Sequence, residues 1–179
     1  MRQASKRSVC AELLAKEDPH LLETNRMPKQ ETINRARKDA REGKSPTTQA
    51  GEFVRDQIRD IRRGKHGARS AKQAIAIGLS EARRAGVPLP PPKPGTTSAA
   101  TRRKAMKDSA KGRAHPNRPP SPKRSKATLK ALKREGRSAA SRKALSRHAR
   151  TVARRKTAAE RSAAGKKAAR TRKARGYSN

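Results

Sequence analysis

The residues of this chain that can do chemistry are its cations. Of 179 residues, 49 are Lys or Arg and 14 are Asp or Glu, which gives a net charge of +35. A chain with this excess repels itself unless a polyanion neutralises it, so the composition predicts a nucleic-acid partner. The side chains that we expect to contact nucleic acid lie in the basic second half: Arg102, Arg103, Lys104, Pro122, Lys123, Arg124, Lys126, Lys130, Lys133, Arg134, Arg142, Lys143, Arg147, Arg150, Arg154, Arg155, Lys156, Lys166, Lys167, Arg170 and Arg172.

One short motif, "SPKR" at Ser121–Arg124, suggests a particular mode of binding. It resembles the S/T-P-K/R-K/R elements of histone tails, in which a Ser-Pro turn presents two cations to the A·T-rich minor groove, where the potential is most negative. A segment this rich in Pro, Ser and Lys also produces the tetrapeptide by chance. Both interpretations stay open from the sequence.

Residues suited to catalysis or metal binding are few and scattered. The four histidines, His20, His66, His115 and His148, form no H-E-x-x-H or H-x₃₋₅-H pair, and the G-x-x-x-x-G-K-[ST] phosphate loop is absent. Cys10 is the single cysteine, which excludes an internal disulfide and a cysteine-based zinc site. We therefore expect no enzyme activity, no cofactor, no metal site and no small-molecule substrate.

The charge is unevenly distributed along the chain. Residues 1–90 carry a net charge of +9 and residues 91–179 a net charge of +26. Aromatic residues make up 1% of the chain, and much of the apolar content is Ala, which buries little area. The expected fold class is therefore mostly α with extensive disorder, built from one small helical hairpin, a Pro-rich linker and a basic, conditionally helical tail.

The hairpin is expected at residues 47–86. Apolar residues at three- and four-residue spacing define its core: Phe53, Val54, Ile58, Ile61, Ile75 and Leu79. Asp56 and Asp60 are predicted to face outward, and Ser70 with Gln73 forms an S-x-x-Q capping box that starts the second helix. Small residues on that helix, Ala74, Gly78 and Ala82, allow the first helix to approach closely.

Three other segments complete the expected organisation. Residues 1–44 read as a weakly helical polar arm, with short helices at 8–17 and from Pro28 to the residue before Gly43. Residues 87–100 read as a Pro-rich linker that separates the hairpin from the basic tail. Residues 101–179 form this Lys/Arg/Ala-rich tail, whose composition is similar to that of linker-histone tails.

Three kinds of partner suit this composition. DNA is favoured over RNA because modules that read single-stranded RNA stack bases on aromatic side chains, and this chain offers only Phe53 and Tyr177. A ribosomal or other structured RNA is the first alternative. The second is a protein-binding adaptor that its basic tail localises. The hairpin is also a candidate for self-association, whereas no segment has the apolar length or face that a membrane requires. We expect a cytoplasmic, nucleoid-associated protein.

The stretches "GEFVRDQIRDIRRGKHGARSAKQAIAIGLSEARRAGVPLPPP" and "SPKRSKATLKALKREGRSAASRKALSRHAR" carry a family resemblance. From about residue 45 to the end, the sequence resembles small basic bacterial proteins that are mostly uncharacterised and are often labelled plasmid stabilization proteins. The resemblance implies a role in DNA maintenance. The sequence does not resemble the compact enzymatic toxins that share this label.

Overall fold

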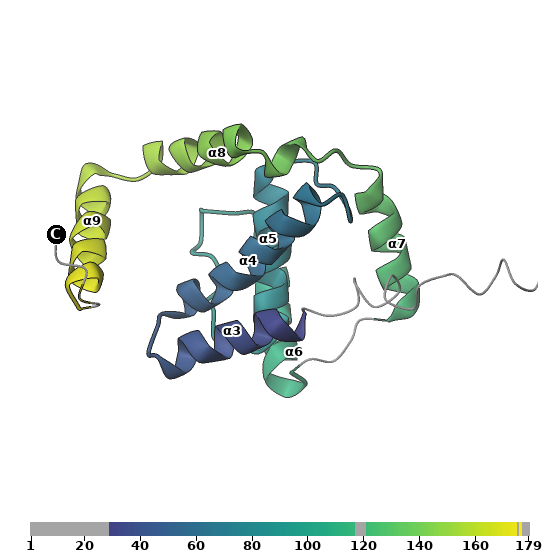
Figure 1. Ribbon diagram of the computed structural model, residues 1–179, viewed down its shortest axis with the longest axis horizontal. Coiled ribbons are helices and arrows are strands. Elements are labelled where there is room, and N and C mark those ends of the chain that lie inside the picture. The colour runs from purple at the N-terminus through teal and green to yellow at the C-terminus, as the bar shows by residue number, and fades with distance from the viewer. Residues whose placement is uncertain (1–28, 117–120, 175, 177–179) are drawn as a thin grey trace, which may run out of the picture.

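The computed structural model describes residues 29–116, 121–174 and 176, and every regular element within them is a helix (Figure 1). The mostly α fold class is thus confirmed for these residues, while the helix predicted at 8–17 lies outside them. The elements are α3 (Gln30–Arg41), α4 (Pro46–Arg62), α5 (Ala71–Arg84), α6 (Ala99–Ala114), α7 (Pro122–Lys133), the 3₁₀ turn η1 (Ser138–Ala140), α8 (Arg142–Arg154) and α9 (Ala158–Ala174).

Local sequence signals set the ends of the first three of these helices. Gly43, Gly64 and Gly86 follow α3, α4 and α5 with φ angles of 67°, 77° and 91°, a left-handed conformation that residues other than glycine rarely adopt. At the start of α5, the Ser70 hydroxyl accepts a hydrogen bond from the Gln73 amide at 3.2 Å. The side chain of Gln73 in turn accepts from the backbone N–H of Arg69 at 2.8 Å.

Helices α3, α4 and α5 share the larger apolar cluster. Leu79 packs against this cluster, whose buried members are Ile33, Ala36, Ala50, Phe53, Ala82, Val87 and Leu89. Val87 and Leu89 belong to the predicted Pro-rich linker at residues 87–100, which we call the proline segment. The guanidinium of Arg83 donates to the carbonyl of Pro90 in this segment at 3.2 Å. The proline segment therefore begins inside the core, because Val87 and Leu89 are apolar enough to be held there. It does not lead directly away from the helices.

Helices α4 and α5 touch backbone to backbone at Gly78. A Cβ atom at this position would lie 2.7 Å from the Cα of Val54 and 2.8 Å from its nitrogen, too close for any side chain. Leu79 joins Phe53 in the first cluster. Ile58 packs beside Ile61 in a second cluster, whereas Ile75 is half-buried and belongs to neither.

Helix α6 docks on the C-terminal half of α5. A Cβ atom on Gly112 would overlap the carbonyl oxygen of Arg83, so the two helices meet through bare backbone. The Ser80 hydroxyl donates to the Asp108 carboxylate at 2.7 Å, and Arg84 lies 3.6 Å from the same carboxylate. The start of the basic region is therefore part of the packed body.

The remaining helices lie around this body and bury none of their own residues. Figure 1 shows α7 on one side of the α4–α5 pair, α8 across one end and α9 on the opposite side from α7. These helices are attached to the body through the segment between α7 and α8, which contacts the loop between α4 and α5. We call this contact the loop junction and define it as residues 62–72 together with residues 132–140.

Candidate nucleic-acid interface

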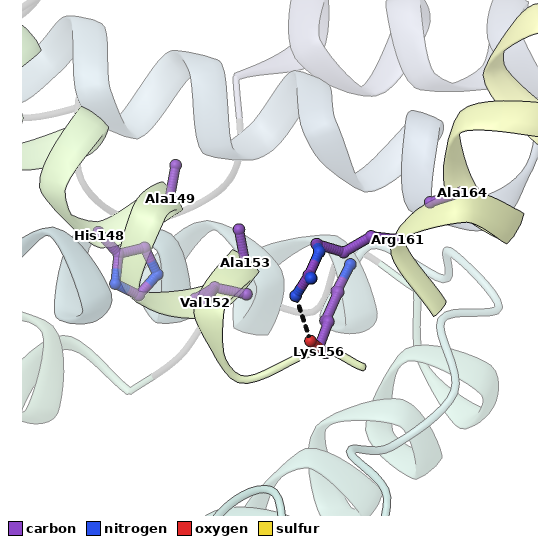
Figure 2. A pocket seen from close by; sticks show the side chains of 7 residues that line it. All are labelled: His148, Ala149, Val152, Ala153, Lys156, Arg161 and Ala164. Carbon is purple, nitrogen blue, oxygen red and sulfur yellow. Dashed lines mark hydrogen bonds between the residues drawn. The ribbon is translucent and has the colours of Figure 1, made fainter. Parts of the chain in front are cut away.

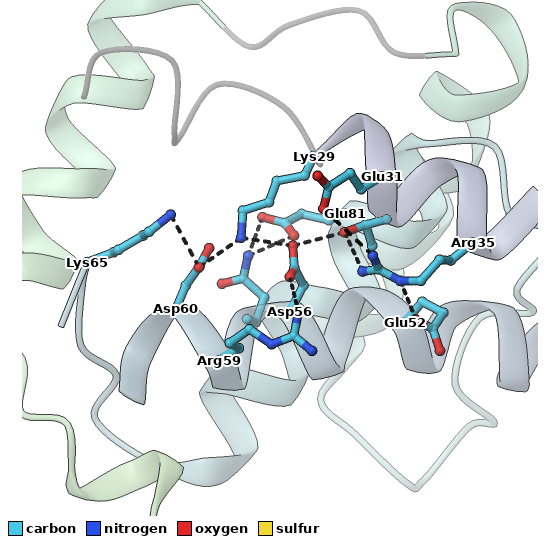
Figure 3. A network of polar contacts seen from close by, with 11 residues as sticks. Lys29, Glu31, Arg35, Glu52, Asp56, Arg59, Asp60, Lys65 and Glu81 are labelled. Carbon is cyan, nitrogen blue, oxygen red and sulfur yellow. Dashed lines mark hydrogen bonds and ion pairs between the residues drawn. The ribbon is translucent and has the colours of Figure 1, made fainter. Parts of the chain in front are cut away.

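The carboxylates of α4 point into the protein. Glu52, Asp56 and Asp60 follow one another at four-residue spacing, and each is less than a tenth exposed (Figure 3). The prediction that Asp56 and Asp60 face outward is wrong. These residues are 7% and 5% exposed because α3 packs on that face of α4 and places polar partners against them.

The partners come from the start of α3. The Lys29 ammonium lies 2.8 Å from the Asp60 carboxylate and 3.2 Å from that of Asp56, which also accepts a 2.9 Å hydrogen bond from Thr32. Burial opposes the charge of Lys29, but the bonds and charges of the two aspartates outweigh it, so the pKa of Lys29 is raised. Arg35 donates to Glu52 at 2.8 Å. The acids of α4 are thus neutralised internally and contribute little negative potential to the surface.

Glu81 on α5 differs from the acids of α4 because it is hydrogen-bonded to an uncharged amide. Both of its carboxylate oxygens accept from the side-chain amide nitrogen of Gln57, at 2.9 and 2.8 Å. Burial raises the pKa of Glu81 to about 7, and the nearby charges of Asp56 and Asp60 act in the same direction. The Gln57 amide oxygen is buried and has no hydrogen-bond partner among the residues that the structure describes. This corner of the network is the part that responds to pH near neutrality.

The cations of α7, in contrast, lie on the outside. On α7, Lys126, Lys130 and Lys133 recur at four- and three-residue spacing and are all exposed, so they share one face of the helix. Leu129 and Leu132 lie on another face and are half-buried. A row of ammonium groups along a helix matches the regular charge of a phosphate backbone.

Helix α8 repeats this division more strongly. Its cations Arg142, Lys143, Arg147, Arg150 and Arg154 fall on one side of the helical wheel and are exposed. The opposite side carries Leu145, Ala149 and Val152, of which Val152 is 40% exposed. The cationic side is therefore free to meet a polyanion.

A shallow hollow separates α8 from α9 (Figure 2). Arg161 spans it and donates to the carbonyl of Lys156 at 2.6 Å. The hollow is lined by His148, Ala149, Val152, Ala153, Lys156, Arg161 and Ala164.

The structure distributes the predicted contact residues over four helices and does not gather them into one patch. All are exposed apart from Arg102, which is half-buried. Helix α6 carries Arg102, Arg103 and Lys104; α7 carries Pro122, Lys123, Arg124, Lys126, Lys130 and Lys133, with Arg134 next; α8 carries Arg142, Lys143, Arg147, Arg150 and Arg154, followed by Arg155 and Lys156; α9 carries Lys166, Lys167, Arg170 and Arg172.

The "SPKR" motif begins a helix in this structure. Ser121 precedes α7, Pro122 is the first helical residue, and Lys123 and Arg124 complete the first turn. Proline suits this position because its fixed φ is helical and its missing N–H would have no partner there. The two cations therefore project from a helix end and not from an isolated Ser-Pro turn.

Sequence reasoning missed the exposed cations of the loop junction. Arg62, Arg63, Arg69 and Lys72 lie at the ends of α4 and α5, and Arg137 lies between α7 and η1. The signal was present in the stretch "RRGKHGARSAK", in which basic residues flank two glycines. By itself this stretch indicates only the turn of a hairpin.

Other kinds of site receive no support from the part of the chain that the structure describes. There, no group of three or more His, Cys, Asp or Glu side chains is arranged to hold a metal ion. His66 is buried, with its Nδ1 3.0 Å from the carbonyl oxygen of Gly67. None of the described helices has the length and apolar character needed to cross a membrane.

Comparison with known proteins identifies one similarity. A family model described as "Family of unknown function (DUF6496)" matches residues 41–93, which is less than a third of the chain. The matched stretch contains α4, α5, the loop between them and the first part of the proline segment. No curated protein and no solved structure shows a significant match. The helical pair and its proline segment are thus similar to a family whose description assigns no activity.

Proposed function

We propose that this is a non-enzymatic DNA-binding protein of the bacterial nucleoid or of a plasmid, and that its binding is largely independent of sequence. The observation that carries the proposal is the separation of charge. Between residues 99 and 174 the only acids are Asp108, Glu135 and Glu160, and Asp108 is buried against α5. The exposed cations of α6 to α9 therefore have almost no internal counter-charge.

Binding would proceed by exchange of counterions. Each phosphate that meets a Lys or Arg releases condensed cations from the nucleic acid, and this release drives association without reading bases. The helical rows on α7 and α8 place cations at regular intervals, which suits a regular backbone. The resemblance to proteins labelled for plasmid stabilization agrees with this role.

Duplex DNA is favoured over RNA by the position of the aromatic residues. Phe53 is 1% exposed, inside the core, and no other Phe, Tyr or Trp occurs in the described ranges. Without an exposed Phe, Tyr or Trp, the described surface lacks the large aromatic side chains on which modules for single-stranded nucleic acid usually stack bases.

A titration in salt tests the proposal. With about 6 to 10 phosphates engaged, we expect affinity for a short fluorescent DNA duplex to fall roughly 10³- to 10⁵-fold between 50 and 200 mM salt. Fluorescence anisotropy measures this, with a structured RNA of equal length as competitor. An affinity that does not change with salt would contradict the proposal, and tighter binding to the RNA would replace DNA by RNA as the partner.

Groove recognition by "SPKR" is tested separately. If Pro122, Lys123 and Arg124 enter the minor groove, replacing the motif by alanine should reduce the preference for A·T-rich over G·C-rich duplex. Replacing Lys126 and Lys130 by alanine removes the same number of charges and should weaken both duplexes equally. If both variants weaken binding to the two duplexes equally, the proposed minor-groove contact is wrong, and contact with the phosphate backbone alone explains the binding.

A further inference from the structure

The loop junction is held by backbone contacts that leave no room for a side chain. The Gly67 amide donates to the Leu132 carbonyl at 2.9 Å, and the Ala68 amide donates to the Gly136 carbonyl at 3.1 Å. A Cβ atom on Gly67 would overlap the carbonyl oxygen of Glu135. The loop after α4 and the segment after α7 are therefore fixed against one another.

Side chains complete this attachment. The second apolar cluster spans the contact and consists of Ile61, Ala68, Ala74, Ala139 and Ala140, with Ile58 packed against it. The guanidinium of Arg62 donates through Nε to the carbonyl of Ala140 at 2.9 Å, across 78 residues of chain. Two segments that are distant in sequence are thus held together at the loop junction.

The charge at this location is almost entirely positive. The two ranges of the junction contain Arg62, Arg63, Lys65, Arg69, Lys72, Lys133, Arg134 and Arg137, and a single acid, Glu135. Among the described residues, only Lys65 of these cations lies within ion-pair distance of a carboxylate, 3.6 Å from Asp60. On the α3 side of α4 the opposite holds, because Lys29, Arg35, Arg55 and Arg59 all pair with acids.

We propose that the loop junction is a phosphate-binding site for duplex DNA, in which Arg63, Arg69, Lys72 and Arg137 contact the backbone. The inference rests on the proposed function and assigns a role to three residues outside the basic tail, Arg63, Arg69 and Lys72, together with Arg137 inside it. Three of the four cations lie in the stretch that the family model matches. Because packing already holds their backbones in place, they lose less conformational freedom on binding than cations on the outer helices.

Matched variants of the full chain test this assignment. The first replaces Arg63, Arg69 and Lys72 by Gln, and the control replaces Lys166, Lys167 and Arg170 of α9, which buries none of its residues. Both lose three charges. We expect the junction variant to lower the slope of log affinity against log salt by up to about 3, at about 0.9 per lost contact, and the control to lower it less, because neighbouring tail cations substitute.

A measurement on the unmodified protein removes any dependence on variant folding. Phenylglyoxal modification, read by mass spectrometry, should be suppressed by duplex DNA at Arg63, Arg69 and Arg137. Arg37 and Arg41, exposed on α3, serve as the reference and should react equally with and without DNA. Equal slopes for the two variants, or equal modification of the junction arginines with and without DNA, would overturn the site. Failure of the unmodified protein to bind any duplex would instead overturn the proposed function.

Discussion

Replacing Glu81 by Gln should change how stability depends on pH. The folded protein holds the pKa of this carboxyl at about 7 through burial, against an ordinary value of 4.5. Glutamine keeps an oxygen that can accept from the Gln57 amide but cannot ionise. The variant therefore removes the titration while preserving the shape of the site.

Linkage determines the sign and the size of this effect. A raised pKa means that the folded state binds this proton more tightly than the unfolded chain, so stability is highest below about pH 4.5 and falls as pH rises to about 7. The shift corresponds to about 3 to 4 kcal/mol at most, since each pKa unit is worth about 1.4 kcal/mol. Glu81 is only partly buried as a residue, which reduces the expected loss to about 2 kcal/mol.

Urea unfolding followed by circular dichroism at several pH values measures the effect. At about pH 4 the two proteins should differ little, and at about pH 8 the Glu81→Gln variant should be about 2 kcal/mol more stable than the parent. Other groups that titrate in this range are common to both proteins and cancel in the difference. Parallel stability curves for the parent and the variant would refute the assignment of Glu81 as the responsive group.

Two further predictions concern the packing of the helical body. Phe53→Ala should cost about 3 to 5 kcal/mol of unfolding free energy, because Phe53 is fully buried between α3, α4 and α5. The control, Val152→Ala on exposed α8, should cost under about 1 kcal/mol. Similar costs for the two variants in urea unfolding would contradict the assignment of Phe53 to the core. Gly78→Val should lower the thermal midpoint by forcing α5 away from the backbone of Val54, at a cost of about 1 to 3 kcal/mol or more. An unchanged midpoint would show that the two helices do not touch there.

Local signals allowed much of the helical structure to be predicted. Gly43 follows α3 where the sequence indicated, and Ser70 caps α5 as the S-x-x-Q pattern predicted. These features depend on residues within one turn of the chain, so sequence alone contains them. The predicted contact residues on α6 to α9, apart from the half-buried Arg102, are exposed for a related reason, since Lys and Arg are rarely buried.

Long-range packing could not be predicted in the same way. Asp56 and Asp60 looked like surface residues because their burial depends on Lys29 and Thr32, which reach them from another helix. Val87 and Leu89 looked like part of a linker because nothing nearby in sequence shows that the core has space for them. The loop junction was missed for the same reason, since it joins segments that only the tertiary fold brings together.

The span of the loop junction also determines the order in which the protein assembles. The contacts among α3, α4 and α5 link neighbouring helices through short loops, so they can form quickly and while later residues are still being synthesised. The bond from Arg62 to Ala140 must close a much longer stretch of chain, which is entropically costlier. The junction should therefore form last and open first. Amide hydrogens at Gly67 and Ala68 would then exchange with solvent before those inside α4, and the basic helices could detach as a unit while the body stays folded.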